Sequence, residues 1–231
     1  MGTALYDEIA DWYEHEFLAI QRAFPNGEWH DSIGVDRVLS ELLGPAPEHA
    51  IDPGCLEIGC GTGIYAERIR SLGWTPLGAD LSSAMLGYAR DRLPVVRADA
   101  AAQPFATGAL SQAVAVMVHT DMPGYPDVVR EAARMLRPGG RLVHVGVHPC
   151  FCGGFADRSD PTAVVVRSGY LDGNWTKDSW TDQGVRDKVG AQHWPLSELL
   201  QMFVDAGFEL RRFVEGDGPS PVVLGLEAVR R

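Results

Sequence analysis

The stretch CLEIGCGTGIYAERIR, Cys55–Arg70, decides how the rest of the chain is interpreted. A short apolar run is followed by glycines at 59, 61 and 63 and then by a helix-like pattern. Glycine-rich turns between a strand and a helix let the backbone approach a nucleotide closely. The third glycine comes one residue early for a dinucleotide fingerprint, where Ile64 stands instead, and no Lys-Ser/Thr pair follows as in a P-loop. We therefore expect a turn that approaches its ligand without having to cradle a phosphate.

Acidic residues end the first three predicted strands. Glu57 lies just before the glycine turn, Asp80 ends the second strand in GADLSSAM, and Asp99 ends the third in RADAAAQPF. A carboxylate after the second strand can accept both hydroxyls of a ribose, and one after the third can face an adenine amino group. Together these acids suit a ligand that is cationic and carries an adenosine.

Strand-like and helix-like segments alternate through the middle of the chain. Strands are predicted near residues 54–58, 75–79, 94–98, 112–118 and 141–147, and helices near 63–72, 82–92 and 124–136. This alternation predicts right-handed βαβ units and a parallel sheet covered on both faces. A helix over 196–206, ended by Gly207, precedes a predicted hairpin of FELRRFV and PVVLGLEAV, so the sheet is expected to end with an antiparallel strand. Helical spacing from Leu5 to Phe24, and again from Ile33 to Leu43, predicts N-terminal helices.

Composition excludes several classes of partner. A formal net charge of −11 argues against binding to nucleic acid, which usually needs a basic face. No apolar run approaches the roughly 20 residues of a membrane span, and the acidic N-terminal stretch does not resemble a signal peptide. The four cysteines fall in two close pairs, unlike a secreted disulfide framework. We expect a cytoplasmic protein with neither a nucleic-acid nor a membrane partner.

Several stretches, in order, resemble one known family. They are LEIGCGTG (56–63), GADLSSAML (78–86), ADAAAQPF (98–105) and VVREAARMLRPGGRLV (128–143). The chain resembles the class I S-adenosylmethionine-dependent methyltransferases, within them the small-molecule, ubiquinone-methyltransferase-like group with a type 11 methyltransferase domain. The resemblance runs from about 52 to 147 and continues more weakly to HWPLSELLQMFVDAGFEL. It implies a Rossmann-like α/β fold with a seven-stranded, mostly parallel sheet, helices on both faces, an antiparallel last strand and an N-terminal helical cap. One departure is SQ at 111–112, where the family usually has FD.

The resemblance also implies S-adenosyl-L-methionine as cofactor and a role for each matched position. Tyr13 belongs to a YD-x-x-A-x-x-Y helix that caps the cofactor in the family, although the same spacing also fits an ordinary core residue. The implied cofactor residues are Tyr13 in the cap, Glu57 at the amino group, Gly59, Cys60 and Gly61 at the methionine end, Asp80 at the ribose, Leu81 beside the adenine, Asp99 and Ala100 at the adenine edge, and Val116 and Met117 in the floor.

Candidates for the acceptor side come from the carboxyl ends of later strands, where ligands of open α/β sheets bind. His119 and His148, after the fourth and fifth strands, are both expected to face the acceptor mouth and are the candidate general bases. Each can equally hydrogen-bond loop backbone, and an acceptor with a free lone pair needs no base. The candidate acceptor-binding residues are Asp121, Cys150, Phe151, Tyr170 and His193.

Two further patterns on this side remain open. The spacing of His148, Cys150 and Cys152 is tighter than that of usual zinc sites, so we expect an apolar wall lined by thiols and no metal. Four cations between 148 and 192 either bind an acidic group on the acceptor or lie on the solvated surface; they are Arg158, Arg167, Lys177 and Arg186.

The expected organisation is a single methyltransferase domain over residues 1–231. It consists of an N-terminal helical cap (1–45), a cofactor-binding core (52–147), an acceptor-side lid (148–192) and a C-terminal helix with a strand pair (193–231). The expected activity is methyl transfer to a small-molecule acceptor. The alternative is a protein with the same fold that binds the cofactor without transferring methyl, as a rearrangement enzyme or a binding or regulatory subunit. The sequence leaves open the acceptor, the atom methylated and the oligomeric state.

Overall fold

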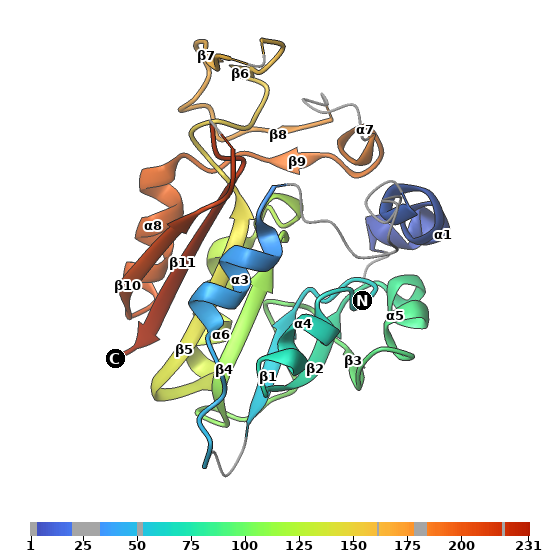
Figure 1. Ribbon diagram of the computed structural model, residues 1–231, viewed down its shortest axis with the longest axis vertical. Coiled ribbons are helices and arrows are strands. Elements are labelled where there is room, and N and C mark those ends of the chain that lie inside the picture. Colours follow the sequence, from blue (N-terminus) through green and yellow to red (C-terminus); the bar gives the residue numbers. More distant parts are fainter. Residues whose placement is uncertain (1–3, 20–32, 50–52, 161, 178–183, 219) are drawn as a thin grey trace.

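A seven-stranded sheet forms the centre of the computed structural model, which describes residues 4–19, 33–49, 53–160, 162–177, 184–218 and 220–231. The strand order is β10-β11-β5-β4-β1-β2-β3 (Figure 1). Strands β1 to β5 pair in parallel, whereas β11 is antiparallel to both β5 and β10. The mostly parallel sheet with an antiparallel last strand is therefore confirmed. The strands are β1 (Gly54–Ile58), β2 (Thr75–Asp80), β3 (Val95–Arg97), β4 (Leu110–Val116), β5 (Leu136–Val147), β10 (Phe208–Glu215) and β11 (Val223–Arg230).

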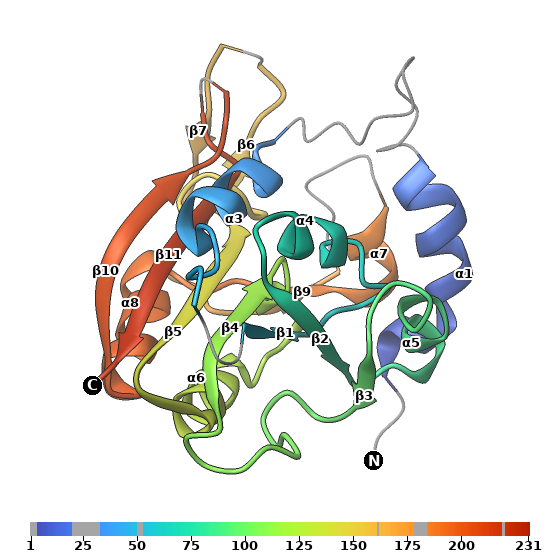
Figure 2. The same ribbon diagram turned by 60° about the horizontal axis from the view of Figure 1, so that its bottom comes forward.

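Helices cover both faces of this sheet (Figures 1 and 2). One face carries α3 (Val35–Leu43), α4 (Ala66–Ser71) and α5 (Ser83–Ala89), and the other carries α6 (Tyr125–Met135) and α8 (Leu196–Asp205). Apolar residues recur on α3 at helical spacing and are all buried against β5 and β11. The central strands are buried on both sides, as expected for parallel strands between two helical layers.

Two element boundaries differ from those predicted. Helix α4 begins at Ala66 and not near residue 63, because the glycine turn occupies the intervening residues. Strand β5 begins at Leu136 and not at 141: Leu136 pairs with Leu110, and pairing resumes at Arg141 after residues 137–140. A register shift between Leu110 and Gln112 on the neighbouring strand accommodates these extra residues.

The N-terminal segment from residue 4 to 18, here called the cap segment, is helical but irregular. It consists of a 3-10 turn η1 (Leu5–Glu8), the short α1 (Ala10–Trp12) and a π-helical turn η2 (Tyr13–Phe17). The regular helix predicted from Leu5 is therefore corrected, and its continuation to Phe24 lies outside the described residues. In both ribbon views the cap segment lies beside α5 and α7 (Val185–Val189).

The segment between β5 and α8 is mostly irregular, as its sequence predicts. It contains two small antiparallel pairs, β6 (Ala156–Asp157) with β7 (Val165–Val166) and β8 (Trp175–Thr176) with β9 (Ala191–Gln192). Figure 1 shows these pairs gathered beyond the ends of β5 and β11. The segment therefore lies at the same end of the sheet as the turns that follow the parallel strands.

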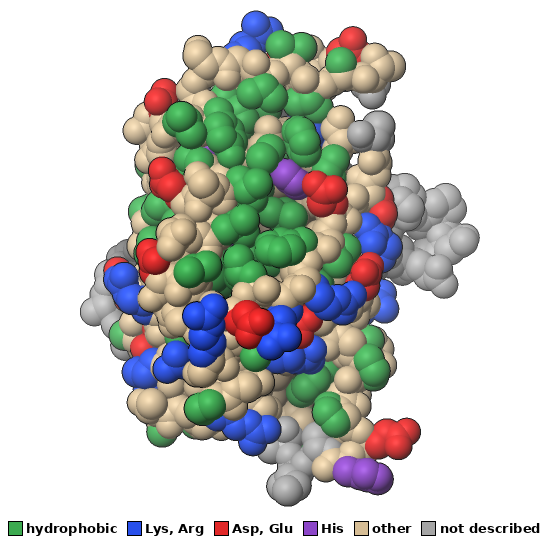
Figure 3. All heavy atoms as spheres, turned by 90° about the vertical axis from the view of Figure 1, so that its left-hand side faces the viewer, with side chains coloured by type: hydrophobic (Ala, Val, Ile, Leu, Met, Phe, Trp, Pro, Cys, Tyr) green, Lys and Arg blue, Asp and Glu red, His purple; other side chains and the backbone are tan. Residues whose placement is uncertain are grey.

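Edge strand β10 and helix α8 form a face with many exposed hydrophobic side chains (Figure 3). Val204 on α8 and Phe213 on β10 are 44% and 51% exposed. None of the helices in the described ranges combines the length and the apolar character that a membrane crossing needs.

Candidate active site

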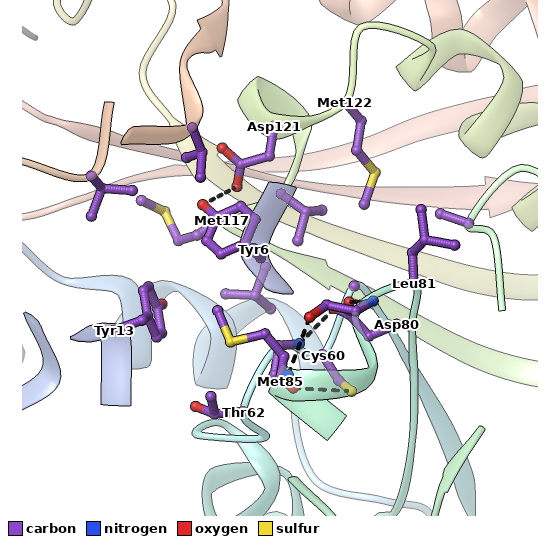
Figure 4. Close-up of a pocket in the computed structure, with 18 of the residues that line it drawn as sticks. Tyr6, Tyr13, Cys60, Thr62, Asp80, Leu81, Met85, Met117, Asp121 and Met122 are labelled. Carbon is purple, nitrogen blue, oxygen red and sulfur yellow. Dashed lines mark hydrogen bonds between the residues drawn. The ribbon is translucent and has the colours of Figure 1, made fainter. Parts of the chain in front are cut away.

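A cavity of about 860 Å³ lies at the carboxyl ends of the parallel strands, beneath the cap segment. Its volume is near the upper end of the usual range for ligand pockets, about 300–1,000 Å³. The structure places every cofactor residue implied by the resemblance in the wall of this one cavity, although these residues range from the cap segment to the end of β4. Figure 4 shows several of these side chains converging on the same space.

The glycine turn after β1 is tied to the end of β2. The amides of Gly59 and Cys60 both donate to the carbonyl of Ala79, at 2.8 and 3.1 Å, and the amide of Gly61 donates to Asp80 Oδ2 at 2.8 Å. Gly59 has a φ of +69°, and a Cβ there would lie 2.7 Å from the side chain of Val118. Only glycine combines this backbone conformation with such close packing against the turn that follows β4.

The two acids at the ends of β1 and β2 are buried but differ in their hydrogen bonds. Asp80 accepts from the amides of Gly61 and Ser82, both at 2.8 Å, and burial raises its pKa. Glu57 is 1% exposed, and its Oε2 has no hydrogen-bond partner among the described residues. Burial, and to a lesser degree the charge of Asp80, raises the pKa of Glu57 to about 8. The pair places two carboxyl groups in the wall, and a cationic ligand would favour their ionised forms.

The floor of the cavity is formed where β4 ends. Met117 has a φ of 57°, a left-handed conformation that is uncommon for residues other than glycine. Its amide still donates to the carbonyl of Val145 at 2.7 Å, so the strained residue is held at the sheet. Strain of this kind is concentrated at functional sites. Here it turns the chain sharply, so that Met117 and Asp121 both line the cavity.

The cap segment covers the cavity with aromatic side chains. Tyr13 stacks on Phe17 with 4.9 Å between ring centroids and meets Tyr6 edge-on at 6.0 Å, and all three rings line the cavity. Asp7 fixes the segment to α5, because it accepts from Ser82 Oγ at 2.6 Å and from the amide of Ala84 at 3.1 Å.

Asp121 is the centre of a buried network that joins three parts of the chain. Tyr6 donates to Asp121 Oδ2 at 3.1 Å, and the two side chains point toward one another in Figure 4. Arg186, from α7, forms an ion pair with Asp121 Oδ1 and also donates to Thr120 Oγ1 at 2.8 Å. The side chains of Arg186 and Asp121 are only 11% and 16% exposed. Asp121 is among the acceptor residues expected from the sequence, whereas Tyr6 and the pairing with Arg186 are not, because a separation of 65 residues gives no local signal.

The structure corrects the expectation that His119 and His148 face the acceptor mouth, since neither is among the described residues that line the cavity. His119 packs in the core against His144, with 5.0 Å between ring centroids, and burial lowers its pKa well below the ordinary value. His148 Nδ1 accepts from the amide of Cys150 at 3.2 Å, and its Nε2 lies 3.1 Å from Glu215 Oε1. Burial also lowers the pKa of His148. Both rings are thus buried outside the cavity wall as the described residues define it.

Most of the predicted acceptor residues also lie outside the cavity wall; they are Cys150, Phe151, Tyr170 and His193. Three of them contact one another in sequence: Cys150 contacts Tyr170, and Tyr170 contacts His193, which precedes α8. His193 contacts Phe155 at 4.7 Å between ring centroids, and Tyr170 OH accepts from the amide of Leu196 at 2.8 Å. Cys152, by contrast, does line the cavity. Within the described ranges, no cluster of three His, Cys, Asp or Glu side chains is placed to hold a metal ion.

Sheet order, glycine turn and paired acids together define the fold of the class I S-adenosylmethionine-dependent methyltransferases. The same fold is seen in the crystal structure of an S-adenosylmethionine-dependent methyltransferase from Mesorhizobium loti, with a TM-score of 0.68 and 19% identity over 85% of this chain and 98% of that one. Residues 56–144 match the family described as the methyltransferase domain. The chain thus contains a methyltransferase domain over residues 56–144 and has the fold of the S-adenosylmethionine-dependent methyltransferases.

Proteins that are similar in sequence are also named as methyltransferases. Methyltransferase GfsG of Streptomyces halstedii is 31% identical over 62% of this chain, and the match spans 58% of the length of GfsG. A demethylmenaquinone methyltransferase of Listeria welshimeri is 25% identical over 71% of this chain and 73% of its own length. The chain thus aligns with little more than half of the first of these relatives.

Proposed function

We propose that this protein transfers a methyl group from S-adenosylmethionine to a small-molecule acceptor. The observation that carries the proposal is the pair of buried acids, Glu57 and Asp80, in the wall of the cavity bounded by the glycine turn. The names of the relatives in sequence support methyl transfer and, in the Listeria protein, a small-molecule acceptor. In this proposal residues 1–231 act as one methyltransferase domain.

The residues fit the cofactor. An unpartnered Glu57 oxygen matches a cationic amino group, and Asp80, fixed by two backbone amides, matches the ribose hydroxyls. Gly61 leaves open space where a Cβ would stand, so the turn can approach a ligand closely. Asp99 would recognise the adenine edge beside Ala100. When bound, S-adenosylmethionine supplies an electrophilic methyl group on a sulfonium.

The protein's own contribution to the reaction is alignment and exclusion of water. Tyr6, Tyr13 and Phe17 cover the cavity, and burial keeps the pKa of both tyrosine hydroxyls above the ordinary value, so they remain neutral donors. Asp121, held by Tyr6 and Arg186, presents its carboxylate at the cavity wall and is the residue that would orient the acceptor. Holding two reactants in contact in a dry site can supply much of the acceleration of a displacement reaction.

The experiment that tests the cofactor site is calorimetric titration of S-adenosylmethionine into the wild type and Asp80→Ala. Loss of the carboxylate leaves the amides of Gly61 and Ser82 without their acceptor and removes the proposed ribose bonds. We expect binding to weaken by about 1–3 kcal/mol. Asp99→Ala is a matched comparison at the adenine edge, since that carboxylate is exposed, and should cost less. Binding unchanged within twofold in Asp80→Ala would remove Asp80 from the site.

A second measurement separates methyl transfer from cofactor binding alone. The protein is incubated with S-adenosylmethionine and mixtures of small molecules, and mass spectrometry follows S-adenosylhomocysteine together with any product heavier by one methylene. We expect both to appear in equal amounts. Tight cofactor binding without either product, across acceptors of all nucleophile types, would favour the alternative of a binding or rearrangement protein with this fold.

A further inference from the structure

The cavity extends beyond the proposed cofactor residues toward β5 and β11. Apart from Tyr13, the proposed cofactor residues come from β1, β2, β4 and the turns that follow them and β3. In the sheet order, β5 and β11 lie on the opposite side of β4 from β1 and β2. The wall at this end is mainly apolar; its residues include Val35, Val147, Cys152 and Val222.

Arg158 stands in this apolar wall, just after β6. Its guanidinium is partly buried and donates from Nη1 to the carbonyl of Phe151 at 3.2 Å and from Nη2 to the carbonyl of Ser220 at 2.9 Å. These two carbonyls fix the position of the guanidinium but are neutral. Arg158 forms no ion pair with any carboxylate in the described part of the chain, whereas the other arginine of the cavity wall, Arg186, is paired with Asp121.

Two neighbouring titratable groups, Cys152 and His148, do not neutralise this charge. Burial raises the pKa of the Cys152 thiol to about 11, so it carries no negative charge near neutral pH. Burial lowers the pKa of His148, so the imidazole is uncharged at the same pH. A guanidinium against an apolar wall is stabilised most by an anion that can accept its paired N–H groups. The structure supplies the fixed cation and the apolar surroundings, and a ligand with an anionic group would supply the counter-charge.

We propose that Arg158 is a specificity-determining residue that binds an anionic group, such as a carboxylate or phenolate, on an otherwise apolar methyl acceptor. The inference deepens the proposed function and rests on it for the assignment of this end of the cavity to the acceptor. Arg158 selects acceptors by charge and anchors them at a fixed distance from the cofactor end. It has no part in proton transfer.

The test uses two nearly isosteric probes, naphthalene-1-sulfonate and the neutral naphthalene-1-sulfonamide. Both are titrated by calorimetry into the protein saturated with S-adenosylhomocysteine, which fills the cofactor end. The wild type should bind the sulfonate at least about tenfold more tightly than the sulfonamide, as expected for charge-assisted hydrogen bonds. Arg158→Gln should abolish that preference and leave the sulfonamide affinity within twofold.

Two further variants make the test independent of folding defects. Arg158→Lys keeps the charge. The difference in log Kd between the two probes should be at least half of that in the wild type. Arg167→Gln changes an arginine of the same segment whose side chain is 63% exposed and paired with Asp157, and it should bind both probes as the wild type does. If Arg158→Gln fails to fold, the neutral Arg158→Met is measured in its place, and loss of the preference is again the expected result.

The results that overturn the inference are equally definite. They are a wild type that does not prefer the sulfonate, a sulfonate that does not bind, or a preference that survives in a folded Arg158→Gln. Failure of the proposed function shows separately: without a cofactor site S-adenosylhomocysteine would not bind in the first step, and without methyl transfer no methylated product would appear in the mass-spectrometric measurement. If it does bind and the sulfonate is not preferred, only the role of Arg158 is lost.

Discussion

Glu14 of the cap segment and Arg92, in the loop after α5, form a two-pronged ion pair. Arg92 Nη1 donates to Glu14 Oε2 at 3.0 Å, and Nη2 contacts Glu14 Oε1. The same Nη1 donates to the carbonyl of Thr62, in the glycine turn, at 2.6 Å. One guanidinium thus connects the cover of the cavity, the loop after α5 and the turn that lines the cofactor end.

Arg92→Ala should therefore loosen the cover. Glu14 is only 5% exposed, so removal of the guanidinium that faces it should lower the free energy of unfolding by about 1–3 kcal/mol. Dissociation of S-adenosylmethionine, followed by stopped-flow fluorescence, should accelerate severalfold. Arg90→Ala, at an exposed position nearby, is the control and should change neither quantity. A destabilised Arg92→Ala with an unchanged dissociation rate would mean that the pair stabilises the fold without holding the cover.

Glu57 should make both stability and cofactor affinity depend on pH. Its pKa rises from an ordinary value of 4.5 to about 8 in the folded protein, so between these pH values the folded state holds a proton that the unfolded state has released. The free energy of unfolding therefore falls as pH rises from about 4.5 to 8 and then levels off. Affinity for a cationic ligand should rise over the approach to pH 8, because the carboxylate forms there.

Glu57→Gln tests this assignment. The variant should lose the fall in stability between about pH 4.5 and 8. At pH 8.5 it should melt at least about 2 °C higher than the wild type. Its affinity for S-adenosylmethionine should be lower than that of the wild type and should no longer rise near pH 8. Thermal melts and titrations at pH 5, 7 and 8.5 check both effects. Parallel pH curves for the two proteins would show that Glu57 is not the titrating group.

The buried His119 and His144 should lower the stability of the protein as the pH falls below 6.5. Burial lowers the pKa of His144 to about 3 and that of His119 well below its ordinary 6.5. Below pH 6.5 the unfolded state binds protons that the folded state does not, so stability falls toward pH 3, by up to about 1.4 kcal/mol per pH unit for each histidine.

His119→Leu should flatten this acid decline, measured by urea unfolding between pH 4 and 7. Its affinity for S-adenosylmethionine should stay within twofold of the wild type, because the ring lies outside the cavity wall. Once an acceptor is identified, turnover should stay within about threefold. A loss in the range of 10²–10⁴, with unchanged cofactor affinity, is what a general base would give, and it would reinstate His119 in that role.

The ion pair of Asp121 and Arg186 should be strongly coupled. Arg186→Met leaves a buried carboxylate without its cation and should destabilise the protein by about 3–5 kcal/mol. Asp121→Asn in the same background should recover part of that loss, with a coupling energy of about 0.5–3 kcal/mol in a double-mutant cycle. Chemical unfolding of the four proteins measures it. The exposed pair of Arg130 and Asp127 on α6 is the control and should show little coupling. Additive effects at Asp121 and Arg186 would contradict the network.

The cofactor side of the cavity could be predicted from sequence because its geometry is local. Glu57, Gly59 and Asp80 stand at the ends of adjacent parallel strands, and the pairing of β1 with β2 brings those ends together. The acceptor side depends on contacts between distant segments. Arg186 meets Asp121 across 65 residues, and Arg158 is placed by carbonyls from two different loops. No local sequence pattern predicts these contacts between distant segments.

The placement of His119 outside the cavity wall has a geometric cause. His119 and Asp121 lie in a 3-10 turn, in which successive side chains point about 120° apart. After the left-handed residue Met117, this turn directs His119 into the core and Asp121 to the cavity. The sequence shows that both follow β4, but it does not show the rotation that separates them.

The antiparallel insertion of β11 between β5 and β10 also bears on the order in which the protein assembles. Every proposed cofactor residue has left the ribosome once Met117 has, yet β5 gains its outer partner only when Val223–Arg230 arrives. Contacts that span such a stretch of chain form slowly, because a large loop must close first. Until then β5 is an unprotected edge, which is a hazard for association between nascent chains. The sheet that carries the cofactor half is therefore completed by a strand synthesised long after that half.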